Sequence, residues 1–264
     1  MQARSAFTAA SRATFTLPQP LPAGDPHGEP PHPCRPPRGV PQKPGLMLPM
    51  RVWDVPVRLF HWALVALLLT SWISIEFANN LRIHMLAGEA ILALLLFRLV
   101  WGFVGSETSR FSHFLGNPFH AVSHLMHMTK KEPDTQVGHN AAGGWMVLVM
   151  LLVLLSQVSL GLIIADEESF IEAPLNHLVG ADWGAWAKKQ HRLLFTGIQI
   201  MVALHLLAIA SYAVLKRHDL VRPMVTGKKR LPAATPQPRM VSPYLALAIL
   251  AAAALVVWVL VTRV

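Results

Sequence analysis

The sequence has very little cysteine and few charged residues for its length. Cys34 is the single cysteine among 264 residues. One thiol cannot build a disulfide framework, hold an iron–sulfur cluster through cysteine ligands or form a C-x-x-C-H haem attachment. Any metal chemistry therefore relies on His, Met or carboxylate side chains. Charged residues make up only 14% of the chain, whereas about 25% is usual in soluble proteins.

Long apolar segments take the place of the missing charge, since 53% of the residues are hydrophobic. A run of about 20 apolar residues is long enough to cross a hydrocarbon core of ~30 Å. The sequence contains five such runs, at roughly 57–78, 85–104, 143–165, 190–214 and 243–262. The basic residues behind the net charge of +9 lie at the edges of these runs, which favours a lipid bilayer over nucleic acid as the partner.

The two ends of the chain differ from this central part. Residues 1–49 are rich in proline, show no apolar periodicity and lack the apolar core of a secretory signal, so we expect a disordered tail. Met47 and Met50 stand at its end, and an over-extended start codon is one explanation of the tail. Residues 50–230 hold the first four apolar runs and form the expected helical bundle. Residues 231–264 form a polar linker and a fifth spanning helix.

Lysine and arginine gather on one side of the expected membrane helices. They precede the first helix, populate the 105–140 loop and follow the fourth helix, whereas the opposite 166–189 loop carries five acids. These acids are Asp166, Glu167, Glu168, Glu172 and Asp182. Because positive residues mark the cytoplasmic side, we expect a cytoplasmic amino terminus and a periplasmic carboxyl terminus.

Two histidines of the fourth predicted helix, His191 and His205, stand fourteen residues apart. An α-helix turns about 100° and rises about 1.5 Å per residue, so these side chains point to nearly the same face, about 21 Å apart. His61 begins the first helix at the depth of His205, and His84 begins the second at the depth of His191. The spacing therefore predicts two stacked pairs, His61 with His205 and His84 with His191.

Two facing imidazoles can ligate one haem iron from both sides in a helix bundle. Gly88 and Gly197 lie near the predicted pairs, and their lack of a side chain would let a flat macrocycle approach the backbone. A lone histidine at a helix end is more often an interfacial residue, but polar groups buried in lipid are costly and usually functional. A proton or metal transporter lined by histidines is the alternative from another class, although the sequence shows neither an inverted repeat nor broken helices.

Several stretches carry a family resemblance, namely VWDVPVRLFHW, RLVWGFVGSETSRFSHF, GHNAAGGWMVLVMLLVLLSQVSLGLI, and HRLLF with the later ALH and LVRPMVTGKKR. Together they cover roughly 50–230 and resemble the prokaryotic cytochrome b561 family, which includes the b-type cytochrome subunits of nickel–iron hydrogenases. The resemblance implies an all-α integral membrane protein whose four-helix bundle holds two non-covalent haems b. It assigns the axial ligands to His61, His84, His191 and His205. The proline-rich tail and the fifth helix lie outside the family pattern.

The resemblance also implies a function. It describes a membrane cytochrome that moves single electrons across the bacterial inner membrane, in a respiratory chain, between the quinone pool and a periplasmic c-type cytochrome. One alternative is the cytochrome b subunit of a Ni,Fe-hydrogenase, which would receive electrons from the hydrogenase small subunit. Another is a superoxide:quinone oxidoreductase. The redox centre is then haem iron rather than a catalytic side chain, and whether the chain is an enzyme or an electron-transfer subunit stays open.

Four ionisable residues near the predicted haem positions have two interpretations each. Arg58 and Arg98 either extend to lipid headgroups or pair with haem propionates. His139, at the start of the third helix, either belongs to a quinone site or caps the helix at the interface. Glu89, below the outer pair, either takes part in proton movement coupled to quinone or is a locally solvated carboxylate.

Overall fold

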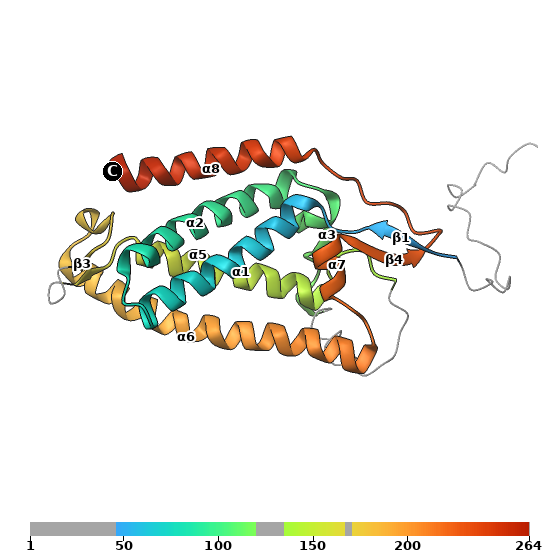
Figure 1. Ribbon diagram of the computed structural model, residues 1–264, viewed down its shortest axis with the longest axis horizontal. Coiled ribbons are helices and arrows are strands. Elements are labelled where there is room, and N and C mark those ends of the chain that lie inside the picture. Colours follow the sequence, from blue (N-terminus) through green and yellow to red (C-terminus); the bar gives the residue numbers. More distant parts are fainter. Residues whose placement is uncertain (1–45, 120–134, 167–170, 264) are drawn as a thin grey trace, which may run out of the picture. The chain divides into compact units, whose positions relative to one another are not determined.

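A computed structural model describes residues 46–119, 135–166 and 171–263 of the chain. Within these residues, five helices are long and apolar enough to cross a membrane, which confirms the predicted fold class. They are α1 (Val55–Glu76), α2 (Leu81–Val104), α5 (Ala141–Gly161), α6 (Ala181–Ser211) and α8 (Pro243–Arg263) (Figure 1). The predicted disorder of residues 1–45 lies outside the described residues.

Short elements connect the spanning helices at the two ends of the bundle. They are β1 (Met47–Arg51), η1 (Glu107–Ser109), α3 (Phe111–Phe114), β2 (Ala165–Asp166), β3 (Ile171–Glu172), η2 (Asn176–Leu178), the π-helix η3 (Tyr212–Lys216), α7 (Val221–Thr226) and β4 (Lys228–Pro232). The strands form two small antiparallel pairs, β1 with β4 and β2 with β3.

Three of the spanning helices begin at a side chain that caps their free backbone amides. Asp54 accepts a hydrogen bond from Val57 N at 2.7 Å before α1, where Pro56 already has the backbone angle of a first turn. Asn80 and Asn140 cap α2 and α5 in the same way. Each cap fixes where its helix starts, and therefore the depth at which the following residues lie.

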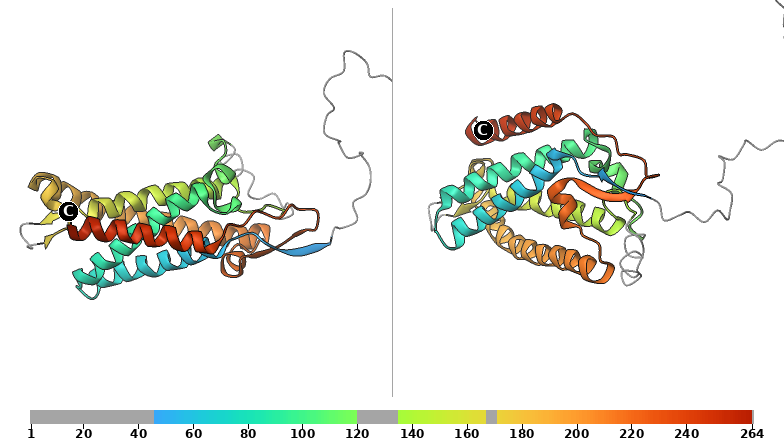
Figure 2. Two further views of the ribbon diagram at one scale, coloured as in Figure 1. Left: turned by 90° about the horizontal axis from the view of Figure 1, so that it is seen from above. Right: turned by 45° about the vertical axis from the view of Figure 1, so that its right-hand side comes forward.

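Helices α1, α2, α5 and α6 form the bundle. Helix α1 packs on α2, α5 packs on α6, and α2 also contacts α5. Helix α8 lies outside this group, along α2 (Figure 1), and Figure 2 shows the same helices from two other sides. Its buried residues Ala246, Ala253 and Val257 recur on one face, and small side chains of this kind allow close packing of membrane helices.

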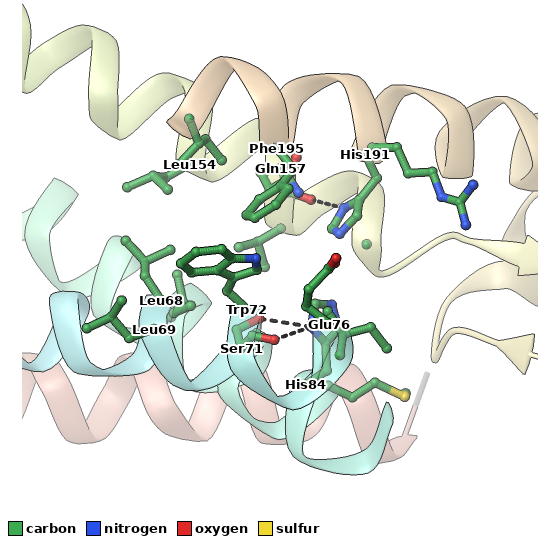
Figure 3. Close-up of a pocket in the computed structure, with 18 of the residues that line it drawn as sticks. Leu68, Leu69, Ser71, Trp72, Glu76, His84, Leu154, Gln157, His191 and Phe195 are labelled. Carbon is green, nitrogen blue, oxygen red and sulfur yellow. Dashed lines mark hydrogen bonds between the residues drawn. The ribbon is translucent and has the colours of Figure 1, made fainter. Parts of the chain in front are cut away.

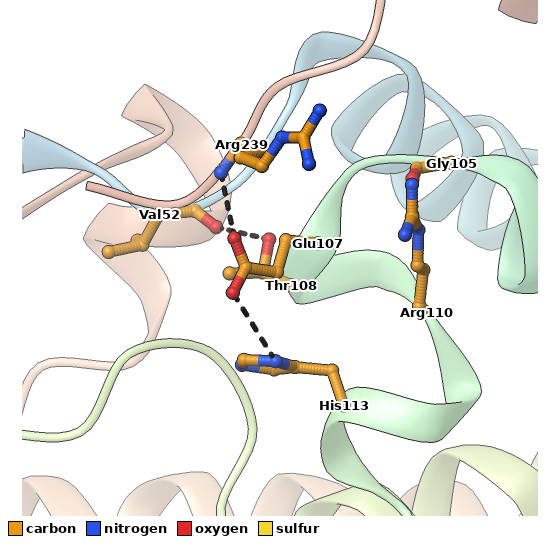
Figure 4. A network of polar contacts seen from close by, with 7 residues as sticks. All are labelled: Val52, Gly105, Glu107, Thr108, Arg110, His113 and Arg239. Carbon is orange, nitrogen blue, oxygen red and sulfur yellow. Dashed lines mark hydrogen bonds and ion pairs between the residues drawn. The ribbon is translucent and has the colours of Figure 1, made fainter. Parts of the chain in front are cut away.

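The linker that leads into α8 is held against the end of α2 by polar contacts (Figure 4). Glu107 N donates to Arg239 O at 3.0 Å, and Arg239 N donates to Glu107 Oε2 at 2.9 Å. Val241 N donates to Ser106 Oγ at 3.0 Å, and His113 Nδ1 lies 3.9 Å from Glu107 Oε1. These bonds fix the point at which α8 begins its course along α2.

The ribbon of β1 and β4 corrects two predicted boundaries. Residues 47–49 were expected in the disordered tail, but they lie in β1 and pair with β4. Leu231 was expected in a polar linker, but it lies in β4 with 0% of its surface exposed. Met50 is buried on the same face of the ribbon, so apolar burial explains why these strands pair.

Helix α6 also differs from its predicted span. It begins at Ala181 rather than near residue 190, and it continues as the π-helix η3 to Lys216. The added first turns contain polar residues and the exposed Trp183 and Trp186, so a search for apolar runs leaves them out. A π-helical segment widens the helix locally and often occurs at functional sites.

Candidate functional site

Two predicted site histidines meet at the end of the bundle where α1 gives way to α2. His84 lies in the first turn of α2, His191 lies on α6, and their ring centroids are 6.1 Å apart with an angle of 77° between the planes (Figure 3). Two metal–imidazole bonds of about 2 Å each, with the ring radius added at both ends, require a centroid separation of about 6 Å. The pair therefore has the spacing of two axial ligands on one metal.

The hydrogen bonds of these two rings fix which nitrogen carries the proton. His84 Nδ1 donates to the backbone carbonyl of Ser71 at 2.9 Å, and the Ser71 hydroxyl lies 3.0 Å from the same nitrogen. His191 Nδ1 donates to the carbonyl of Gln157 at 2.9 Å. Because a carbonyl only accepts, each Nδ1 is protonated and each Nε2 keeps the lone pair that a metal needs.

A large apolar cavity adjoins the pair. Its volume is about 850 Å³, and its walls include Leu68, Trp72, Leu154 and Phe195, which point inward in Figure 3. Cavities of roughly 300–1,000 Å³ with mostly apolar walls and few polar groups are typical of cofactor sites. The residues around it thus fit a flat, hydrophobic group that carries a metal.

Two glycines allow close approach at this site. A Cβ on Gly161 would come within 3.2 Å of Cε1 of His191, which is a tight contact, so the glycine lets α5 lie against this ring without displacing it. Gly88 lines the cavity, and a Cβ there would meet no other protein atom within 4 Å. The space beside Gly88 is therefore open to a bound group.

The other predicted pair, His61 of α1 and His205 of α6, lies toward the opposite end of the bundle. The two side chains are close enough to interact electrostatically. Nδ1 of His61 is buried and has no hydrogen-bond partner among the described residues. A buried polar atom without a partner is costly, and unlike Nδ1 of His84 and His191 this atom has no carbonyl that fixes the tautomer of the ring.

Arg98 and His139 lie in the same region. Arg98 is only 2% exposed, so it does not extend to headgroups; its guanidinium lies 5.1 Å from the Phe111 ring and interacts with the charge of Asp54. His139 lies between the rings of Trp53 and Phe114, at centroid distances of 4.6 and 4.9 Å.

The enclosed position of His139 determines its protonation state. Burial, together with the nearby positive charge of Arg98, lowers the pKa of His139 to about 3. Nδ1 of His139 and Nη1 of Arg98 are both buried and lack a partner among the described residues. His139 is thus a neutral imidazole beside a buried cation, and the two offer unsatisfied hydrogen-bonding groups to a ligand.

Arg58 and Glu89 take different positions from each other. Arg58 directs one terminal nitrogen to the carbonyl of Val225 in α7, so part of its guanidinium caps that short helix. Its Nε atom is buried and lacks a partner among the described residues. Glu89 is half-buried and lines the cavity beside His84 and His191. A propionate contact of Arg58 and a proton role of Glu89 stay predictions.

Sequence reasoning missed the groups that orient the rings of His84 and His191. The carbonyls of Ser71 and Gln157 are backbone atoms, and a backbone acceptor leaves no signature in a sequence. The structural role of Asp54 was also missed, although an acid two residues before a proline is a recognisable start signal for a helix. Asp54 accepts hydrogen bonds from Trp101 Nε1 at 3.1 Å and Ser109 Oγ at 3.0 Å.

A membrane bundle with facing imidazoles, oriented by carbonyls beside an apolar cavity, defines an integral membrane haem protein. Residues 52–227 match the family model described as prokaryotic cytochrome b561. The match covers more than half of the chain, and the chain belongs to this family. It is a membrane-spanning b-type cytochrome, whose redox group is haem b. The predicted tail and α8 lie outside the matched residues.

Two curated relatives have the same kind of description. The chain is 23% identical over 212 residues to a "Probable Ni/Fe-hydrogenase B-type cytochrome subunit" of Bradyrhizobium diazoefficiens, which covers 68% of this chain and 85% of the relative. It is 24% identical over 210 residues to a protein of the same description from Rhizobium leguminosarum bv. viciae, covering 67% and 87%. No solved structure matches the chain.

Proposed function

We propose that this chain binds two haems b and carries single electrons through the membrane. The outer haem would be held by His84 and His191, and the inner one by His61 and His205. The observation that carries this proposal is the outer pair, in which both Nδ1 atoms donate to carbonyls and the rings lie 6.1 Å apart. The electrostatic interaction between His61 and His205 supports the inner pair.

Bound haem supplies one-electron chemistry at iron, and the residues of this chain set the conditions for it. The carbonyls of Ser71 and Gln157 hold the outer imidazoles in the tautomer that ligates, and they raise the basicity of both rings. The apolar walls of the cavity exclude water. Two imidazoles of this chain would hold each haem, which suits electron transfer rather than substrate binding at the metal.

Arg98, Arg58 and His139 are the proposed polar partners at the inner end. Arg98 offers a buried cation with an unpartnered Nη1, and Arg58 offers a buried Nε, so both suit a haem carboxylate. His139 is the proposed quinone residue, since it is enclosed by aromatic rings and its Nδ1 is available for a hydrogen bond. Electrons would then enter or leave the quinone pool at this end.

The outer haem is the proposed contact with a redox enzyme. Both relatives are described as hydrogenase cytochrome subunits, which favours the small subunit of a nickel–iron hydrogenase over a periplasmic c-type cytochrome as the partner. The clustering of Lys and Arg supports a cytoplasmic amino terminus and a periplasmic carboxyl terminus in a bacterial inner membrane.

A reduced-minus-oxidised spectrum with the haem-to-protein ratio tests this proposal. The parent protein should show b-type bands and two haems per chain. His84→Ala should remove the outer haem and retain most of the inner one, and His205→Ala should do the reverse. A transporter would show no such bands.

Two further histidines serve as matched controls. His177 lies at the outer end in η2, and His113 lies at the inner end in α3, and neither belongs to a proposed pair. His177→Ala and His113→Ala should keep two haems and unchanged spectra. The pairing is wrong if His84→Ala or His205→Ala also keeps two haems.

A further inference from the structure

The ribbon of β1 and β4 has two chemically different faces. Side chains alternate between faces along a strand, and Met50 and Leu231 are buried on the face toward the bundle. Arg51, Lys228 and Arg230 lie on the opposite face and are exposed. Arg51 is directly opposite Lys228, and like charges in this position destabilise a strand pair. Neither strand contains an acid, so no anion within the ribbon offsets this repulsion.

Helix α7 lies beside the first turns of α1. Arg58 of α1 donates to Val225 O, and Trp62 Nε1 donates to Met224 O at 3.4 Å. Trp62 is an exposed residue of a spanning helix, as is the neighbouring Leu59. Helix α7 is therefore at the level where α1 enters the membrane, rather than beyond the end of the bundle.

The outward face of α7 combines apolar and basic side chains. Val221 and Val225 are four residues apart and thus share one face, where they are 48% and 51% exposed. Arg222 is exposed beside them. Gly227, with φ of 77°, turns the chain from α7 directly into β4, and its carbonyl accepts from Val52 N next to β1. Helix α7 and the ribbon therefore adjoin at Gly227.

We propose that these adjoining faces of α7 and the ribbon form a surface that binds the anionic headgroups of the membrane leaflet that it faces. Arg51, Arg222 and Lys228 would donate to lipid phosphates, while Val221 and Val225 would enter the boundary with the acyl chains. Exposed valines next to cations at the membrane edge have the composition of an interfacial segment, and anionic lipid supplies the charge that the ribbon lacks. The proposal rests on the proposed topology for the identity of the leaflet, but it does not depend on haem.

A lipid titration tests the charged part of the surface. The haem-loaded full chain in neutral detergent is titrated with phosphatidylglycerol or phosphatidylcholine, and bound lipid is counted by native mass spectrometry. The triple variant Arg51→Gln, Arg222→Gln, Lys228→Gln should bind phosphatidylglycerol more weakly, by about fivefold for each cation removed. Arg239→Gln removes a cation from the linker before α8 and should bind like the parent.

Depth measurement tests the apolar part independently. In a Cys34→Ser background, nitroxide labels are attached at Val225→Cys and at the lipid-facing Leu59→Cys. Dissolved oxygen, which concentrates in the bilayer, should enhance the spin relaxation of both labels equally. A label at Ala234→Cys, in the turn after the ribbon, should instead respond to a water-soluble nickel chelate.

Two results would overturn the lipid surface. The triple variant would bind phosphatidylglycerol as tightly as the parent, or the Val225 label would respond to nickel like the Ala234 label. Haem content and spectra should stay unchanged in all of these variants. If the haem proposal is wrong, the spectra and haem content will show it. If the lipid proposal is wrong, only lipid binding or label depth will show it, so the two outcomes can be told apart.

Discussion

Replacing Asp54 should destabilise the protein more than any other single change at the capped end of α1. The carboxylate is buried and accepts three hydrogen bonds, from Val57 N, Trp101 Nε1 and Ser109 Oγ. Asp54→Ala removes the helix cap, which is worth about 1 kcal/mol. It also leaves the two fully buried donors of Trp101 and Ser109 without an acceptor, at about 1–3 kcal/mol each. The expected loss is therefore at least about 3 kcal/mol.

Asp54→Asn should cost less than Asp54→Ala because the amide keeps one oxygen for the cap. The Ser109 hydroxyl can rotate to accept from the amide, whereas the indole N–H of Trp101 can only donate and stays without an acceptor. Both variants also remove the negative charge that interacts with buried Arg98. We therefore expect the order of stability to be parent, Asp54→Asn, Asp54→Ala.

Thermal and chemical unfolding in detergent, followed by circular dichroism, measures this order. A double-mutant cycle with Trp101→Phe isolates the indole hydrogen bond, because the double variant has no stranded donor at this position. The cycle should show a coupling of about 1–3 kcal/mol. If Asp54→Ala unfolds within about 1 kcal/mol of the parent, or the cycle shows no coupling, Asp54 does not join α1 to α2 as argued.

Four other changes have outcomes that the structure determines. Gly88→Ala should stabilise the helix by up to about 1 kcal/mol yet lower the haem-to-protein ratio, because the new methyl meets only the bound group; full haem content in Gly88→Leu would contradict this. The low pKa of His139 means that the folded protein excludes a proton that the unfolded chain takes up below 6.5. The free energy of unfolding should therefore fall by up to about 1.4 kcal/mol per pH unit as the pH drops from 6.5 toward 3. Thermal unfolding at a series of pH values should show a smaller pH dependence for His139→Gln than for the parent. Deleting residues 1–46 should leave haem content intact, whereas deleting 1–51 removes β1 and should lower the melting temperature. Truncation after residue 239 removes α8 and should lower the melting temperature but keep the haem bands.

The five spanning helices could be predicted because a membrane span requires only length and apolar composition. The depth argument placed His84 near His191, and the structure brings their rings together; their role as ligands stays a prediction. The β1–β4 ribbon could not be predicted, because its strands are about 180 residues apart in sequence and neither alternates clearly. The contact between Asp54 and Trp101 could not be predicted either, because these residues are also far apart in the sequence.

The direction of Arg58 shows a different limit of sequence reasoning. Its position one turn before His61 suggested a haem carboxylate, but the side chain also reaches the carbonyl of Val225 in α7. A residue on a helix has several neighbours at the same depth, and sequence spacing gives the depth without the direction. Only the fold reveals that α7 returns to this part of α1.

The arrangement around His84 and His191 explains why all four bundle helices take part in holding one pair of imidazoles. Helices α2 and α6 contribute His84 and His191, but each ring is oriented by a helix that carries neither histidine. Helix α1 supplies the carbonyl of Ser71 and α5 supplies that of Gln157. A ligand ring held only by its own helix would keep its rotational freedom, and the iron would then have to bear the cost of ordering both rings. Helix α8 contributes no residue to the cavity wall, so it supports α2 without taking part in this orientation.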